Sequence, residues 1–435
     1  MKIFNLLFAA VLSLQTANAG QYYISIGAAK VKKSVLAIPF VKLNGSGGLL
    51  DHAKTLHSTL NRDLAFTSLF TIQDTNAFLE PQSAGIALDS FKLSDWTSIG
   101  SEFLLKTELA KDGDVLSFEV RLYDVLGGKQ ILGKKFSAKN NEAVLLAHTA
   151  ASAVLESLTG KPGMFTSRLA FVCNKSGNKE IYTADFDGAN PKQLTHHRSL
   201  AFAPAWSPDG KYLSYSLYTK NSKNIKNIDL YEYNFDSGRS VLMSNRQGTN
   251  SGASYSPDGS KIALTMSFLG NQEIFALDRS SKQVTKLTQS FGFDVDPAWS
   301  PDGKSVAFVS SRAGLPMVYS MNADGSGVKR LTFAGRYNAT PSWSPDGKKL
   351  AFAGWNEGHF DIFTMNTEGT GLERLTKEEG SNEDAHFSPD GLFVAFSSTR
   401  SGQKNIYAIS IDGQTTHRLS YGLGQCEAPK WSLPK

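Results

Sequence analysis

Residues 343–347 read Trp-Ser-Pro-Asp-Gly, and the fold can be predicted from this motif because the chain repeats it. Five further copies, the last one shortened to Trp-Ser-Leu-Pro, begin at Trp206, Tyr255, Trp299, Phe387 and Trp431. The leading aromatic residues of successive copies lie 49, 44, 44, 44 and 44 residues apart. A period of about 40 to 50 residues is typical of repeat architectures, and four short strands per repeat indicate the blades of a β-propeller.

The fourth copy shows how one repeat builds a sheet. Pro sets φ at one corner of the Ser-Pro-Asp-Gly turn, and Gly takes the corner with positive φ. Strands are predicted over residues 341–343, 350–352, 361–365 and 373–375. The last strand ends in Leu-Thr, a pair that recurs in the other repeats. Because one such sheet cannot bury both of its faces, each must stack on its neighbours around an axis.

The two ends of the repeat region predict how the ring closes. Residues 168–171 match the second strand of a repeat, but no Ser-Pro-Asp-Gly turn precedes them. Trp431 begins a first strand, but no second strand follows it. Joining the two completes a sixth blade and leaves no unpaired strand. We therefore expect a small α/β N-terminal domain followed by an all-β, six-bladed β-propeller over residues 165–435, closed by the C-terminal strand.

Residues 1–19 have the features of a signal peptide. Lys2 supplies the positive charge, an apolar stretch too short to span a bilayer follows, and Ala17-Asn18-Ala19 fits the small-x-small cleavage rule. The mature chain is then expected to begin at Gly20 and to be exported. Residues 20–34 alternate in polarity as a strand does, so they form an ordinary edge strand or chain end, or a strand that adds to a partner's sheet.

Residues 35–160 are predicted to form the α/β domain. Buried strands are expected over 35–40, 69–72 and 103–109, and a hairpin over 116–136 turns at Gly127-Gly128. Apolar residues at helical spacing predict two amphipathic helices, over 49–64 and 144–158. Gly160 and Pro162 end the second helix, and residues 161–164 are expected to link the two domains.

Charge and motifs exclude several classes of function. The chain has 45 basic and 40 acidic residues, a net charge of +5, which is too small to indicate nucleic-acid binding. The sequence contains no Gly-x-Ser-x-Gly elbow, no His-Glu-x-x-His motif and no phosphate-binding loop. We therefore expect a protein that is not an enzyme and that carries no cofactor.

The loops that precede the first strand of each blade are expected to surround one mouth of the channel. Their sequences differ from blade to blade, whereas the sequences of the blade cores repeat. Variable loops on a rigid scaffold are common recognition sites, although an ordinary solvated rim has the same composition. Several carboxylates near one axis also leave open a divalent cation in the channel. The candidate partner-binding residues at this mouth are Arg198, Arg246, Thr249, Asn250, Asp294, Asp296, Tyr337, Asn338, Asn382, Glu383, Gln425 and Glu427.

The two cysteines fall at matching positions of the repeat. Cys426 lies five residues before Trp431, and Cys173 lies four residues after Leu169. In an intact repeat these positions lie on adjacent antiparallel strands, so we expect the cysteines to be cross-strand neighbours at the seam. Whether they are bridged depends on the register, because a shift of one residue would turn the two side chains to opposite faces.

The combination of export signal, small α/β domain, Ile38-Pro39-Phe40 strand and six blades resembles the TolB family of periplasmic Tol-Pal proteins. This resemblance covers residues 20–435 and implies a non-catalytic, periplasmic adaptor that supports outer-membrane integrity and cell division. It implies that the peptidoglycan-associated lipoprotein Pal binds at the propeller mouth. Bacteriocins of the colicin type use the same mouth in the family and are a further candidate partner.

The resemblance also implies that TolA binds the mature N-terminal segment. In this chain the implied TolA residues are Gly20, Gln21, Tyr22, Tyr23, Ile24, Ser25, Ile26, Lys30, Lys32 and Lys33. This segment departs from the family, because Ser25 and Ile26 stand where an aspartate is common. Two rival hypotheses are a propeller subunit that gates a peptidase carried on another chain and a propeller that binds a small molecule or sugar.

Overall fold

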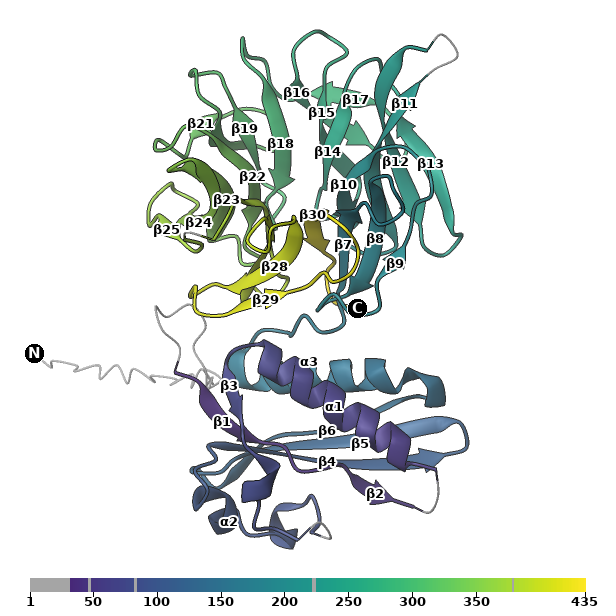
Figure 1. Ribbon diagram of the computed structural model, residues 1–435, viewed down its shortest axis with the longest axis vertical. Helices are drawn as coiled ribbons and strands as arrows, with labels where there is room; N and C mark the ends of the chain where they lie inside the picture. Colours follow the sequence, from purple (N-terminus) through teal and green to yellow (C-terminus); the bar gives the residue numbers. More distant parts are fainter. Residues whose placement is uncertain (1–31, 46–47, 82–83, 221–223, 378) are drawn as a thin grey trace, which may run out of the picture.

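The computed structural model describes residues 32–45, 48–81, 84–220, 224–377 and 379–435, which form two domains stacked end to end (Figure 1). The predicted signal peptide and residues 20–31 of the N-terminal segment lie outside the described residues. Both expected domain types are present: a small α/β domain comes first, and a six-bladed propeller follows.

The first domain is one mixed sheet with two long helices on one face. Its strands are β1 (Ser34–Ala37), β2 (Lys42–Asn44), β3 (Phe70–Ile72), β4 (Phe103–Asp112), β5 (Val115–Asp124) and β6 (Lys129–Lys139). The helices are α1 (Leu50–Phe66), α2 (Leu93–Thr97) and α3 (Ala143–Thr159), and short 3₁₀ turns span Thr75–Ala77, Leu88–Ser90 and Asn140–Glu142. The sheet order is β3-β1-β4-β5-β6, and β2 also pairs with β4. Helices α1 and α3 lie between the sheet and the propeller (Figure 1).

The strand predicted over 35–40 is shorter in the structure, because β1 ends at Ala37. A separate strand that was not predicted, β2, begins at Lys42 and pairs with a later part of β4. Pro39 lies between the two strands, and proline has no N–H to donate to a sheet. Helix α3 ends at Gly160, which has a φ of 72°. Met164, in the predicted linker, is 1% exposed and packs into the core.

Each propeller blade is a four-stranded antiparallel sheet. Blade 1 contains β10 (Ala201–Trp206), β11 (Tyr212–Lys220), β12 (Lys226–Asn234) and β13 (Arg239–Ser244); blade 2 contains β14 (Asn250–Tyr255), β15 (Lys261–Met266), β16 (Glu273–Asp278) and β17 (Val284–Lys286). Blade 3 contains β18 (Asp294–Trp299), β19 (Ser305–Ser310), β20 (Met317–Asn322) and β21 (Lys329–Arg330); blade 4 contains β22 (Asn338–Trp343), β23 (Lys349–Asn356), β24 (His359–Asn366) and β25 (Glu373–Arg374). Blade 5 contains β26 (Asn382–Phe387), β27 (Phe393–Ser398), β28 (Asn405–Ser410) and β29 (Thr416–Arg418); blade 6 contains β30 (Cys426–Trp431), β7 (Arg168–Cys173), β8 (Glu180–Asp185) and β9 (Lys192–Gln193).

The repeated Ser-Pro-Asp-Gly turns share one hydrogen-bond pattern. In blade 3, Ser300 Oγ donates to Asp302 Oδ1 at 2.6 Å, and the same oxygen accepts from the Lys304 N–H at 3.1 Å. The Ser305 N–H donates to Ser300 Oγ at 2.9 Å. The Ser300 hydrogen bond, followed by the Lys304 N–H, holds the pKa of Asp302 below its usual value. Ser and Asp therefore recur because they satisfy the backbone of this turn.

A β-bulge occurs at the same place in every innermost strand. The third residue of the strand has positive φ in all six blades: Ala203, Gly252, Asp296, Thr340, Asp384 and Ala428. The pairing with the second strand shifts at this residue in each blade. Such a bulge bends the strand and redirects its side chains. The innermost strands of neighbouring blades contact one another around the complete ring.

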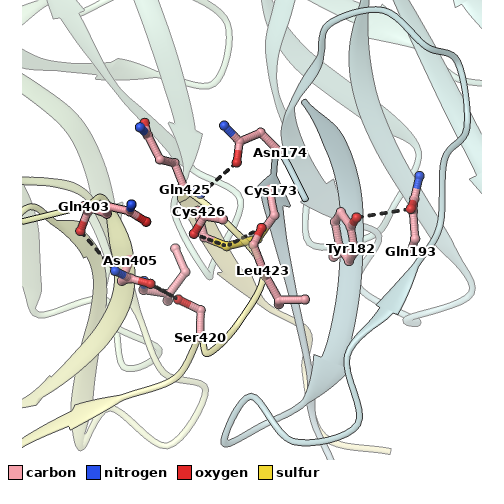
Figure 2. The surroundings of a disulfide bond; sticks show 12 residues. Cys173, Asn174, Tyr182, Gln193, Gln403, Asn405, Ser420, Leu423, Gln425 and Cys426 are labelled. Atoms are coloured by element: carbon pink, nitrogen blue, oxygen red, sulfur yellow. Dashed lines mark hydrogen bonds between the residues drawn. A yellow bond between two sulfur atoms is a disulfide. The ribbon is translucent and has the colours of Figure 1, made fainter. Parts of the chain in front are cut away.

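The seam of the ring lies in blade 6, where strands from both ends of the propeller meet. Trp431 pairs with Leu169, and Cys426 lies directly opposite Cys173 with the Cα atoms 4.3 Å apart. A disulfide joins the two cysteines, as Figure 2 shows. The register that the repeat predicts is therefore the one that brings the two sulfur atoms together.

The domains share a continuous apolar core rather than a flexible joint. Phe66, at the end of α1, contacts the rings of Phe186 and Phe393 at centroid distances of 5.3 and 5.0 Å. Arg62 Nε lies 3.2 Å from a carboxylate oxygen of Asp187 across the same interface. Blades 5 and 6 thus provide the surface against which the helices of the first domain pack.

Candidate functional site

The distal mouth, defined as the end of the channel where the innermost strands begin, faces away from the first domain (Figure 1). Two hairpins project beyond it. In blade 1, β11 and β12 have nine residues each, and in blade 4, β23 and β24 have eight, whereas the matching strands of the other four blades have six. Blades 1 and 4 are three positions apart in a ring of six, so the two hairpins stand on opposite sides of the mouth.

A pocket of about 570 Å³ opens beside the blade 4 hairpin. Its walls include Tyr337 from the loop before β22, Trp355 from β23 and Phe360 from β24. Glu383 and Asp384 of β26 form the blade 5 side, and Arg336 lies at the rim. Burial, followed by the charge of Asp296, raises the pKa of Tyr337. The pocket therefore combines aromatic surface with carboxylates at the mouth.

Four of the predicted partner-binding residues are buried at the first position of an innermost strand. Asn250, Asp294, Asn338 and Asn382 are 0 to 3% exposed. Asn250 Nδ2 donates to the Arg246 carbonyl at 2.6 Å, and Asp294 accepts from Arg312 Nη2 at 2.9 Å. These side chains recur every 44 residues because they satisfy backbone and arginine groups inside the blade, and a partner cannot touch them in this conformation.

The remaining predicted residues lie around the mouth with different degrees of exposure. Arg198 and Gln425 are exposed, whereas Arg246, Thr249, Asp296, Tyr337, Glu383 and Glu427 are partly exposed. Two lysines hold the carboxylates of the rim: Lys404 lies 3.2 Å from Glu383 and 4.0 Å from Glu427, and Lys179 also pairs with Glu427. The structure thus gathers a polar rim from several blades.

The axial channel carries a cluster of opposite charges. Burial raises the pKa of Asp296, while Lys430 lowers it and Asp384 raises it. Burial lowers the pKa of Lys430, and the two aspartates oppose that shift. In the described part of the chain, no group of three or more His, Cys, Asp or Glu side chains is placed to hold a metal ion. The channel carboxylates instead lie within electrostatic reach of an ammonium group.

Arg336, Trp355 and Phe360 of the pocket are not among the residues predicted from the sequence. A signal was present, because the repeat places Ser311 and Thr399 at the position of Trp355, and Pro316 and Lys404 at the position of Phe360. Blade 1 has Tyr218 at the position of Trp355, but blade 4 alone has aromatic residues at both positions, so the repeat does not require this pair. They mark the place where blade 4 differs from its neighbours.

The described end of the predicted TolA segment lies near the domain interface. Lys32 Nζ is 3.5 Å from Glu102, and both Lys32 and Lys33 are exposed. Burial lowers the pKa of His417 in blade 5, its hydrogen bond to the Phe66 carbonyl opposes this, and the charge of Lys33 adds to the lowering. Lys33 therefore lies within electrostatic reach of the propeller. Among the described residues, no helix has the length and apolar composition needed to cross a membrane.

Comparison with known proteins identifies relatives of both domains. The TolB beta propeller domain model matches residues 155–434, and the TolB amino-terminal domain model matches residues 22–131. The crystal structure of TolB from Acinetobacter baumannii superposes with a TM-score of 0.81 at 28% identity, covering 95% of this chain and 100% of that one.

Two curated relatives are similar over shorter regions. The Tol-Pal system protein TolB of Desulfosudis oleivorans is 37% identical over 290 residues, which is 66% of this chain and 65% of the relative. A protein TolB homolog of Chlorobium chlorochromatii is 38% identical over 245 residues, 55% of this chain and 53% of the relative. The chain thus spans between half and two thirds of the length of these relatives. Its two domains, their order and the six-bladed ring agree with these matches, and the chain belongs to the TolB family.

Proposed function

We propose that this chain is a non-catalytic, periplasmic adaptor of a Tol-Pal system that binds the lipoprotein Pal at the distal mouth and TolA through residues 20–33. Relatives named as Tol-Pal system proteins support membership of the system. The observation that carries the Pal site is the unrepeated rim, with its two projecting hairpins and the pocket beside Tyr337. Rigid blades that present variable loops are suited to protein recognition.

The rigidity of the scaffold has a specific origin. Trp206 Nε1 donates to the Lys430 carbonyl at 3.0 Å, and Trp343 Nε1 donates to the Ala298 carbonyl at 2.9 Å, so the repeated tryptophans fasten one blade to another. With the ring also closed by the Cys173–Cys426 disulfide, the rim loops hold fixed relative positions. A preformed surface loses less conformational entropy when a partner binds.

Blade 5 offers a physical connection between the two proposed partner sites. Its innermost strand carries Glu383 and Asp384 at the pocket, and its outermost strand carries His417 against Phe66 and near Lys33. A partner at the mouth that shifts blade 5 would change the surface beside the N-terminal segment. Such coupling requires the partner to bind one state of that segment more tightly than the other.

Isothermal titration of the mature protein with Pal from the same organism tests the mouth. Trp355→Ala, which removes an aromatic wall of the pocket, is expected to weaken binding about tenfold. Leu126→Ala is the control, because Leu126 is 74% exposed between β5 and β6 of the first domain. Equal affinities of the wild type and Trp355→Ala for Pal would refute a Pal site at this pocket.

Deletion of residues 20–33 tests the second site and the coupling. The truncated protein is expected to lose TolA binding and to bind Pal with a changed affinity. Retained TolA binding would refute the proposed TolA segment. Loss of TolA binding with unchanged Pal affinity would remove the coupling and leave the adaptor role in place.

A further inference from the structure

The pocket beside blade 4 is built by residues that the propeller repeat does not need. Trp355 and Phe360 face each other in the register of β23 and β24, beyond the point where the matching strands of blades 3 and 5 end. At the same two positions blade 2 has Ser267 and Gln272. Both aromatic side chains are only partly buried, so they add less to the core than a buried ring would. Their placement is better explained by recognition than by folding.

The three aromatic rings are arranged around one another as walls. The Phe360 ring meets Trp355 at a centroid distance of 5.0 Å and an interplanar angle of 81°, and it meets Tyr337 at 5.7 Å and 88°. The small side chains of Ala339 and Ala353 also line the pocket, which leaves space between the rings. Aromatic walls of this kind attract cations, because the face of each ring carries negative potential.

The charges that line the pocket sum to an excess of one negative charge. Glu383 and Asp384 are the carboxylates, and Arg336 is the cation at the rim. Glu383 is already paired with Lys404 at 3.2 Å. Asp384 Oδ2 accepts from Ser397 Oγ and from the Ala428 N–H, but no hydrogen bond from a described residue reaches Oδ1. Asp384 lies within electrostatic reach of Lys404 and Lys430, but its Oδ1 keeps an acceptor for an incoming donor.

We propose that this pocket holds a cationic side chain, a lysine or an arginine, that the protein partner inserts between Tyr337, Trp355 and Phe360 toward Asp384. The inference rests on the proposed function, because it names the group by which a partner at the distal mouth is recognised. An apolar side chain would pack against the rings but would donate no hydrogen bond to Asp384 Oδ1. A cation satisfies both.

The pocket can be tested without the partner. The mature protein is labelled with 5-fluorotryptophan, and the Trp355 fluorine resonance is assigned as the one that Trp355→Phe removes. The probes are N-acetyl-lysine methylamide, N-acetyl-arginine methylamide and N-acetyl-norleucine methylamide, which has an apolar side chain with no charge. Saturable shifts of the Trp355 resonance are expected with the lysine or arginine probe, and the stronger of the two identifies the side chain.

Two variants and one control locate the interaction. Phe360→Leu removes a ring and Asp384→Asn removes the charge, and each is expected to weaken binding of the cationic probe about two- to thirtyfold. Phe291→Leu changes a fully exposed ring in the loop before β18 and is expected to leave binding unchanged. An equal response to the norleucine probe, or unchanged affinity in both pocket variants, would overturn the proposal.

The two proposals fail separately. If Pal binds the protein but neither cationic probe moves the Trp355 resonance, the cationic pocket is refuted and the adaptor role stands. If a cationic probe binds in the expected manner but Pal does not bind, the pocket stands as a cation site and the partner assignment is refuted.

Discussion

The imidazole of His417 in blade 5 stacks on the ring of Phe66 at the end of α1, with the centroids 4.2 Å apart and an interplanar angle of 17°. His417 Nε2 also lies 3.0 Å from the Phe66 carbonyl oxygen. These two residues are 351 positions apart in the chain, and their contact fastens the first domain to the propeller. Because the contact is both apolar and hydrogen-bonded, it fixes the angle between the domains as well as their distance.

Phe66→Ala is expected to lower the free energy of unfolding by about 3 kcal/mol and to separate the melting of the two domains. Phe66 is 8% exposed, so its removal leaves a cavity in the shared core. Phe40→Ala is the matched control, because Phe40 is 43% exposed in the same domain. Differential scanning calorimetry measures both effects. A single transition with an unchanged midpoint in Phe66→Ala would show that the interface does not join the domains.

The seam disulfide is expected to stabilise the propeller. Replacing both Cys173 and Cys426 by alanine should lower the free energy of unfolding by about 2 to 4 kcal/mol, since the bridge constrains a loop of 253 residues in the unfolded chain. The β30–β7 pairing remains, so the ring still closes. Urea denaturation with and without a reductant measures the change. A reductant should shift the midpoint of the wild type and leave that of the double variant unchanged, and a reductant-independent wild type would contradict the prediction.

The protein is expected to lose stability as the pH falls below about 6.5. Burial, followed by the charge of Lys430, lowers the pKa of His386 well below its usual value. The Trp431 N–H donates to His386 Nδ1 at 3.4 Å, which a protonated Nδ1 could not accept. Below about pH 6.5, His386 therefore binds a proton in the unfolded chain but not in the folded protein. The free energy of unfolding then falls by up to about 1.4 kcal/mol per pH unit.

The contribution of His386 can be identified by substitution. His386→Gln should reduce the slope of unfolding free energy against pH between about 7 and 5, because glutamine does not titrate. Part of the slope should remain, because burial also lowers the pKa of His57, His197 and His417. His196→Gln, at an exposed position, should leave the slope as it is in the wild type. Equal slopes in the wild type and His386→Gln would mean that His386 does not contribute to acid sensitivity.

Alanine substitutions at Gly325 and Gly314, both in blade 3, distinguish the energetic cost of a steric clash from the cost of backbone strain. Their φ values are 89° and 100°, so alanine is strained at either position. A Cβ on Gly325 would lie 2.3 Å from the Leu287 carbonyl oxygen of blade 2, whereas nothing lies within 4 Å of one on Gly314. We expect Gly314→Ala to cost about 1 kcal/mol and Gly325→Ala at least about 2 kcal/mol more, measured by urea denaturation. Similar losses of unfolding free energy in the two variants would show that blades 2 and 3 can move apart at this turn without a large energetic cost.

The propeller ring could be predicted from local sequence patterns. The 44-residue period predicted the number of blades. The motif is shortened at Trp431, and no Ser-Pro-Asp-Gly turn precedes the strand at 168–171, so these two strands were predicted to close the ring within blade 6. The alignment of repeats even placed Cys173 opposite Cys426. These features follow from sequence because the turn residues and strand lengths of each repeat are local, and stacking identical units leaves few alternative arrangements.

The residues that face a partner could not be predicted from those patterns. Asn250 and Tyr337 occupy neighbouring positions of the repeat and look equally polar in sequence, yet the bulged strand buries the first and leaves the second at the pocket. The pocket also depends on how far the β23–β24 hairpin projects and on side chains of two different blades. The contact between Phe66 and His417 could not be predicted either, because the sequences of the two domains do not indicate their relative orientation. Such contacts arise from packing between elements distant in the chain, which local residue patterns do not encode.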